Sequence, residues 1–312
     1  MPYIEATDAK LYFEECGYGY PIIFIHEFAS DMRGSDAQVS HFCRGFRCIA
    51  FNARGYPPSD VPEDPSSYGW EIAVDDVAAL MRALGIERAH LVGLSMGGYT
   101  ALQFGLRYPD KVTAIAAASV ASGSHPSHRA AWLKETSVFA RLFSEHGMAS
   151  LAERIARGPA RIQLQYKDPR GWQEFIARLR RYSPQGMSNT IARCQALRPS
   201  LDELHDQLSK MTIPVLLAVG DEDVRCLEPN LLLKSMLPNA GLWICQNTGH
   251  AINLEEPAAF NAQVESFFSA VERGSWRRRY LPSQSAHESV RHRSGSSAGK
   301  LDQDRELQLQ HG

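Results

Sequence analysis

The sequence predicts an α/β protein in which helices cover both faces of a mostly parallel sheet. Two short apolar runs, residues 22–25 and 48–51, are typical of strands buried on both faces. Between and after such runs the chain changes to amphipathic stretches. One of these repeats apolar side chains at helical spacing: Val74, Val77, Ala78, Met81 and Leu84. Strands that alternate with helices along a chain favour a parallel sheet.

The remaining elements follow in order. We expect an outer strand and six buried ones, at residues 10–14, 22–25, 48–51, 90–92, 112–118, 214–220 and 241–245. The helices between them begin and end at recognisable residues. Gly85 ends the first helix, Pro109 bounds the second, and Pro257 opens the last, because proline suits a first helical position. A further helix is expected at residues 227–236.

The domain organisation follows from where this alternation stops. Residues 121–208 contain helix formers and amphipathic stretches but no strand-like run, which predicts a helical cap between two strands of the sheet. Residues 1–120 and 209–272 then form the core. Long insertions in compact domains usually serve the active site, although longer connections would also fit the pattern. Residues 273–312 are polar and low in complexity, so we expect a disordered tail.

Composition narrows the class of protein. The chain has 312 residues, of which 44% are hydrophobic, and a formal net charge of −2, so no overall field favours nucleic acid or anionic membranes. The N-terminus lacks the pattern of a signal peptide, and no apolar run approaches the length of a membrane span. The six cysteines lack C-x-x-C spacing, which predicts reduced thiols, a cytoplasmic location and no metal site. We expect a monomer or homodimer that acts on a small molecule and needs no cofactor.

The segment from Gly93 to Gly97 carries the strongest chemical signal. It has the pattern G-x-S-x-G between an apolar run and a helix-like run, with Ser95 at its centre. At a strand-to-helix turn this pattern holds a serine in a strained backbone conformation, so that its hydroxyl stands clear of the sheet. The glycines are needed because strand and helix pack closely there. Ser95 is therefore the predicted nucleophile.

A serine hydroxyl needs a base and an acid, which should follow at the ends of later strands. His250 follows the last strand and is the predicted base. Asp223 is the preferred acid, because it lies deepest in the loop after residue 220, whereas Asp221 is more typical of a turn. The preceding strand ends at residues 119–122 without a carboxylate, which favours Asp223.

An oxyanion requires two preorganised N–H donors. The amide of Met96, directly after the nucleophile, is one expected donor. The loop that follows residues 22–25 supplies the other, and Phe28 is the expected residue.

These residues resemble the α/β-hydrolase superfamily over about residues 3–272. Five segments match in order: the His26 loop, residues 52–59, the Ser95 turn, residues 220–223 and Gly249-His250. The resemblance implies an eight-stranded, mostly parallel sheet with the cap inserted after the sixth strand. Members include carboxylesterases, lipases, thioesterases, C–C bond hydrolases, perhydrolases and a few receptors.

Two residues depart from the family pattern. Many relatives have His-Gly in the oxyanion loop, where this chain has His26-Glu27. An ionised carboxylate aimed at an oxyanion would oppose catalysis, so we expect Glu27 to point away and to pair with Arg54. Many relatives also have Asp in place of Asn52, for which only a structural consequence is expected.

The leading functional hypothesis is a serine hydrolase that cleaves a small or medium carboxylic ester. Tyr166, Trp172 and Met187 are candidate pocket residues from the cap. One alternative is C–C bond hydrolysis of a dienoic acid, which needs a cap cation for the substrate carboxylate; the candidates are Arg161, Arg180, Arg181 and Arg193. A second alternative is a ligand-binding or receptor protein that keeps the fold with little turnover.

Overall fold

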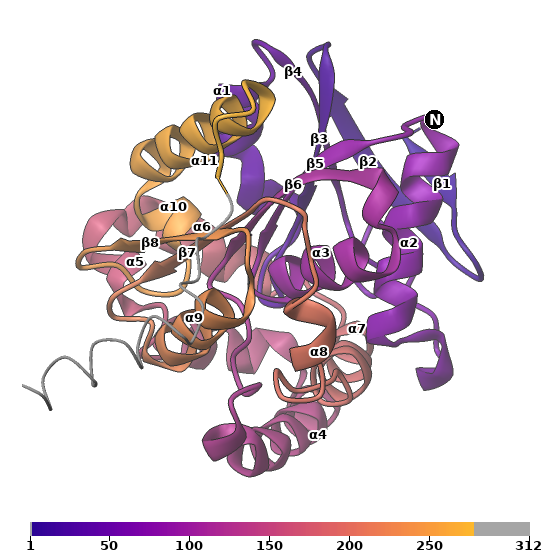
Figure 1. Ribbon diagram of the computed structural model, residues 1–312. Coiled ribbons are helices and arrows are strands. Elements are labelled where there is room, and N and C mark those ends of the chain that lie inside the picture. The colour runs from indigo at the N-terminus through magenta and orange to yellow at the C-terminus, as the bar shows by residue number, and fades with distance from the viewer. Residues whose placement is uncertain (1, 278–312) are drawn as a thin grey trace, which may run out of the picture. The chain divides into compact units, whose positions relative to one another are not determined.

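A computed structural model describes residues 2–277 and contains one eight-stranded sheet in the order β1-β2-β4-β3-β5-β6-β7-β8 (Figure 1). Its strands are β1 Tyr3–Glu5, β2 Lys10–Cys16, β3 Tyr20–Ile25, β4 Phe46–Phe51, β5 Ala89–Leu94, β6 Val112–Ala118, β7 Val215–Gly220 and β8 Ala240–Cys245. Strand β2 runs antiparallel to both β1 and β4, and every pairing from β4 to β8 is parallel. The predicted fold, an eight-stranded and mostly parallel sheet with helices, is confirmed.

The period of two along each strand builds an apolar core on both faces. In β3, Ile23 and Ile25 join the cluster under α2 (Trp70–Ala83) and α3 (Met96–Arg107). Their neighbours Ile22 and Phe24 join the opposite cluster, which α1 (Asp36–Phe42) and α11 (Pro257–Glu272) cover. Figure 1 shows α1 and α11 together on one side of the sheet, with α2 and α3 on the other. Two-sided burial explains why these strands are apolar throughout.

The segment between β6 and β7 is helical, with no strand in its length. It comprises α4 Pro126–Ala156, α5 Ile162–Lys167, α6 Pro169–Leu179, α7 Pro184–Asn189, a π-helical turn over Thr190–Gln195 and α8 His205–Leu208. Helix α4 is interrupted at Gly147, whose φ of 70° lies in the left-handed region that glycine tolerates. One face of α6 packs on α4 in a third apolar cluster, which also contains Met96 from the core. The helices are therefore seated on the sheet end that carries the Ser95 turn; the cap boundaries at residues 121 and 208 stay a prediction.

The last described residues pack against the core. The Trp276 ring meets Phe267 edge-on at a centroid distance of 4.6 Å, and its indole N–H donates to the Asn239 carbonyl at 3.1 Å. The predicted tail began at residue 273, before this contact, because a single tryptophan in a polar stretch carries no periodic signal. The rest of the predicted tail, residues 278–312, lies outside the described residues.

Two further expectations concern cysteines and membranes. All six cysteines lie within the described residues, and none forms a disulfide. No helix within residues 2–277 combines the length and the apolar character that crossing a bilayer requires. Helix α9 (Val224–Met236) and the short α10 (Ile252–Glu255) complete the elements that surround the C-terminal strand ends.

Candidate active site

The Ser95 turn joins β5 to α3 with strained backbone geometry. Ser95 has φ 53° and ψ −109°, a conformation that few residues other than glycine adopt. Its neighbours leave no space for side chains: a Cβ on Gly97 would lie 2.0 Å from the Ile25 carbonyl oxygen, and one on Gly93 2.3 Å from that of Gly97. Close packing of strand and helix thus explains both glycines, and it keeps the serine at the carboxyl end of β5.

His250 and Asp223 meet from the loops after β8 and β7. The Nδ1 of His250 lies 2.8 Å from Oδ2 of Asp223, and both side chains are buried. The two neighbouring acids are engaged elsewhere. Asp221 accepts the Thr248 amide at 3.2 Å, and Glu222 accepts from Gln163. Of the three adjacent carboxylates, therefore, Asp223 is the one that orients His250.

The charges of this pair depend on each other. Burial opposes ionisation of Asp223, but the charge and hydrogen bond of His250 outweigh it and hold the pKa of Asp223 below its ordinary value. Burial likewise disfavours the His250 cation, yet Asp223 outweighs it, so the pKa of His250 is raised above 6.5. The pair is therefore suited to hold a proton on the imidazole while the aspartate stays ionised.

Glu27 pairs with Arg161 and not with Arg54, and it is not among the described residues that line the cavity at Ser95. Its carboxylate forms a two-fold ion pair with Arg161, in which Nη1 donates to Oε1 at 2.7 Å and Nη2 donates to Oε2. The same Oε2 lies 3.8 Å from Nε2 of His250. Glu27 is 1% exposed, and the Arg161 charge holds its pKa low against the effect of burial. The expectation was wrong because Arg161 comes from the distant cap segment, which local pattern does not locate.

Arg54 instead ties the loop after β4 to helix α2. It donates to both oxygens of Asp76, at 2.7 and 2.8 Å, and to Asp8 at 2.7 Å. Asn52 links backbone to backbone, accepting the Met32 amide at 2.9 Å and donating to the Pro57 carbonyl at 2.8 Å. These contacts join the loop after β4 to the segment at Met32, and the expectation of a purely structural role for Asn52 stays a prediction.

The oxyanion loop is braced from the neighbouring loop after β4. The His26 ring accepts the Ala53 amide at Nε2 (3.0 Å) and contacts the Glu27 carbonyl through Nδ1 (2.7 Å). The Tyr56 hydroxyl donates to the Phe28 carbonyl at 2.7 Å. Met96 is the first residue of α3, where amide groups lack partners within the helix. Both predicted oxyanion donors thus belong to rigidly supported backbone.

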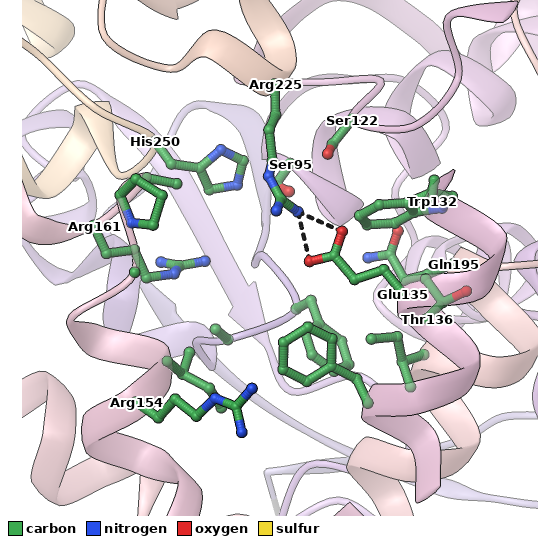
Figure 2. A pocket seen from close by; sticks show the side chains of 18 of the residues that line it. Ser95, Ser122, Trp132, Glu135, Thr136, Arg154, Arg161, Gln195, Arg225 and His250 are labelled. Carbon is green, nitrogen blue, oxygen red and sulfur yellow. Dashed lines mark hydrogen bonds and ion pairs between the residues drawn. The ribbon is translucent and has the colours of Figure 1, made fainter. Parts of the chain in front are cut away.

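A cavity of about 300 Å³ opens at this site. Ser95, His250 and Phe28 line it, together with apolar cap residues such as Phe139 and Phe143. Figure 2 shows the polar side chains around it, including Arg161 and the Glu135–Arg225 ion pair, whose oxygens lie 2.9 Å from Arg225 Nη1. The volume suits a small organic molecule.

The three cap residues predicted for the pocket do not line this cavity. The Tyr166 side chain is 76% exposed on the surface of α5. Trp172 and Met187 are buried within the apolar cluster that holds the cap helices together. Large apolar residues in an amphipathic helix pack against other helices as readily as against a ligand, and periodicity does not distinguish the two.

Sequence reasoning missed two neighbours of His250. The cap segment reaches the histidine loop, where the Ala160 carbonyl accepts the His250 amide at 2.8 Å. The Cys226 thiol donates to the Ser119 carbonyl at 3.2 Å and lies 3.8 Å from Nδ1 of His250. Neither belongs to a short motif, and no local signal would have found them.

The chemistry of Cys226 also bears on metal binding. Asp223, Cys226 and His250 offer ligand atoms within 4.8 Å of one another, but burial raises the pKa of the Cys226 thiol well above 9. Metals bind the thiolate, so this buried thiol is a poor ligand. His125, His128 and Glu228 form a second such group nearer the surface, where exposed ion pairs are common.

A family model and individual relatives both match the chain, and both point to the same family. The model of the α/β-hydrolase fold family matches residues 20–257. An α/β-hydrolase superfamily protein of Bacillus subtilis, YisY, is 28% identical over 85% of this chain and 98% of its own length. The 3-oxoadipate enol-lactonase 2 of Acinetobacter baylyi is 26% identical over 78% of this chain and 87% of its own.

Solved structures agree on the fold. An esterase from Thermogutta terrifontis superposes with a TM-score of 0.77 at 24% identity, covering 86% of this chain and 98% of its own. An enol-lactonase from Burkholderia xenovorans does so with a TM-score of 0.75 at 22% identity, covering 86% and 100%. With the family model matching most of its length, the chain belongs to the α/β-hydrolase family.

Proposed function

We propose that this protein is a serine hydrolase that cleaves a small or medium carboxylic ester through Ser95, His250 and Asp223. The observation that carries the proposal is the 2.8 Å contact between Asp223 and His250, beside a strained turn whose serine lines the same cavity as the histidine. The enol-lactonase and esterase relatives act, by name, on cyclic and open esters, which is in keeping with this chemistry.

The proposed reaction has two halves. Oγ of Ser95 attacks the ester carbonyl while its proton passes to Nε2 of His250, and the amides of Met96 and Phe28 hold the oxyanion. The bond from carbonyl carbon to alcohol oxygen then breaks, and the alcohol leaves with the proton from His250. Water, deprotonated by His250, attacks the acyl-enzyme, which releases the acid and restores Ser95. No step needs a cofactor, and a cytoplasmic location is part of the same proposal.

The C–C hydrolase alternative needs a free cation in the cap. Of the four arginines considered for it, Arg161 lines the cavity but is bound to Glu27. Arg180 donates to Glu153 at 2.7 Å, and neither it nor Arg181 and Arg193 is among the described residues that line the cavity. None of these four arginines therefore offers the cavity a free cation, and they give this alternative no support over an ester.

Hydrolysis of p-nitrophenyl esters from acetyl to decanoyl tests the proposal, with wild type and Ser95→Ala measured side by side. We expect kcat to fall by at least about 10⁴-fold in the variant at unchanged melting temperature, because the nucleophile and its base act as a unit. The chain-length optimum would give the length of the acyl pocket. A folded wild type that turns over none of these esters would overturn the ester proposal and favour a binding protein.

A further inference from the structure

Arg198 is a buried arginine in the wall of the candidate active site. It follows the π-helical turn, is 3% exposed, and lines the same cavity as Ser95 and His250. Its position is fixed by the residues around it. The Tyr99 hydroxyl donates to the Pro199 carbonyl at 2.6 Å, and Arg129 Nη2 donates to the Arg198 carbonyl at 2.7 Å. Because Tyr99 lies one turn after Ser95 in α3, the arginine is anchored to the nucleophile's own helix.

The Arg198 guanidinium has contacts within residues 2–277, but no acidic side chain in that range supplies a counter-charge. Its carbon lies 4.6 Å from the ring centroid of Tyr99 and 5.7 Å from that of Trp132. Nη2 donates to the Ser122 carbonyl. Among residues 2–277, no acidic side chain forms an ion pair with it, and its Nε is buried without an acceptor.

The other arginines that line the cavity differ from Arg198, because each is either paired with an acid or exposed to water. Arg161 is matched by Glu27 and Arg225 by Glu135, while Arg154 is exposed to water. The indole Nε1 of Trp132, which also lines the cavity, is a second buried donor without an acceptor. Two side chains that line one cavity, one of them cationic, therefore each carry a buried donor for which the described residues offer no acceptor.

Physical chemistry makes this arrangement costly unless an acceptor arrives. Burial lowers the pKa of Arg198 to about 10, so the group still carries its charge at neutral pH. A buried charge is normally paired. A buried donor without an acceptor loses its hydrogen bonds to water and gains none from the protein, which costs free energy. A carboxylate supplies both the opposite charge and two acceptor oxygens, and it fits the planar guanidinium better than a neutral carbonyl does.

We propose that Arg198, assisted by the Trp132 indole, binds a carboxylate group that the ester substrate carries in addition to its scissile ester. The inference rests on the proposed esterase function. It narrows the substrate class to half-esters of dicarboxylic acids, or to hydroxy acids whose hydroxyl group is acylated and whose carboxylate is free. The cavity volume of about 300 Å³ limits such a substrate to a short chain.

The competing interpretation is structural: Arg198 would only hold the Ser122 carbonyl and stack between two rings. A purely structural arginine would affect charged and neutral esters equally. The test therefore compares esters that differ in charge but hardly in size.

Two probe pairs serve this purpose. Monomethyl and dimethyl esters of succinic to suberic acid place the charge in the acyl half, and 4-acetoxybutyrate with its methyl ester places it in the alcohol half. We expect wild type to prefer the charged member of at least one pair by about 10- to 100-fold in kcat/KM, the range typical of charge-assisted hydrogen bonds. Arg198→Met should abolish that preference and leave the neutral ester within about 3-fold of wild type, while Arg198→Lys should retain part of it.

Arg154→Met is the matched control, because it removes one hydrated positive charge from the same cavity wall. It should leave the preference for charged esters within about 2-fold of wild type. If Arg198→Met fails to fold, the wild-type comparison still decides: equal kcat/KM for charged and neutral members of both pairs would overturn the inference. So would a charge preference that Arg198→Met leaves intact.

Binding to Ser95→Ala separates this inference from the proposed function. Calorimetry with monomethyl adipate should show binding that the added Arg198→Met substitution weakens about 10-fold or more. Such binding without turnover by wild type would refute the esterase proposal and leave the carboxylate site standing. Turnover of neutral esters with no charge preference would do the reverse.

Discussion

At the scale of single residues, the carboxylate of Glu27 sets this site apart from a simple triad. It lies 3.8 Å from Nε2 of His250, on the opposite side of the imidazole from Asp223, and Arg161 neutralises it. Glu27 raises the pKa of His250 and Arg161 lowers it, so the pair adjusts the base in opposing directions. The base is therefore coupled to the cap through a salt bridge.

This coupling predicts opposite pH shifts for the two partners. His250 acts as a base only when neutral, so kcat/KM rises with pH through the pKa of His250. Glu27→Gln removes a negative neighbour and frees the Arg161 charge, which lowers this pKa and moves the acid limb to lower pH. Arg161→Met leaves the Glu27 charge without a counter-charge, which raises the pKa of His250 and moves the acid limb to higher pH. The pH profile of kcat/KM on a neutral p-nitrophenyl ester measures both.

The double variant Glu27→Gln/Arg161→Met is the control, because single substitutions leave a buried charge without its partner, at a cost of about 3–5 kcal/mol in stability. Its free energy of unfolding should exceed that of either single variant. The acid limb of its pH profile should lie between those of the two single variants. Shifts in the same direction for both single variants would contradict the coupling.

At the scale of elements, the Ser95 turn is held by contact between backbones. Gly97, the second residue of α3, lies directly against the end of β3, where a Cβ would lie 2.0 Å from the Ile25 carbonyl oxygen and 2.7 Å from that of His26. Any side chain there displaces the nucleophile turn and the oxyanion loop together. One glycine thus fixes the relation between two parts of the candidate site.

Gly97→Ala should therefore lower the free energy of unfolding by more than about 3 kcal/mol, as other large steric conflicts do. Gly45→Ala is the matched control, since a Cβ at that exposed turn meets nothing within 4 Å, and its effect should stay within about 0.5 kcal/mol. Denaturant unfolding of both variants makes the comparison. A Gly97→Ala variant as stable as Gly45→Ala would refute this account of the turn.

At the scale of the whole molecule, Trp276 marks where the packed chain ends among the described residues. Its ring covers Gly241 and meets Phe267, which closes one face of the sheet near β8. The composition of residues 278–312 offers little for a core. We infer that stability depends on the residues up to 277.

Two truncations test this boundary. The free energy of unfolding of a chain that ends at residue 277 should lie within about 0.5 kcal/mol of that of the full-length protein, and its hydrolytic activity should be unchanged. A chain that ends at residue 272 loses the Trp276 contacts and should be destabilised by about 1–3 kcal/mol, the value of burying a large apolar side chain. A large loss of stability in the chain that ends at residue 277 would refute the prediction that residues 278–312 form a tail outside the core.

Much of the fold was accessible from local pattern. Apolar runs and helical periodicity located the seven principal strands, because a strand buried on both faces must be apolar along its whole length. The edge strand β1 and helix α1 escaped detection, since three residues with one buried side chain, and seven with two, carry too little periodicity. The residues brought to one sheet end, Ser95, Asp223 and His250, follow directly from strand ends in a parallel sheet.

The remainder depended on packing between distant segments. Glu27 meets Arg161 across 134 positions of the chain, and Arg198 meets Ser122 across 76. The same packing turned Tyr166 outward and buried Trp172 in the cap. Periodicity states that a helix has an apolar face, but how several helices share their faces is settled only when they pack together. That packing decided which charges are matched at the candidate site, and among residues 2–277 it left Arg198 without an acidic partner.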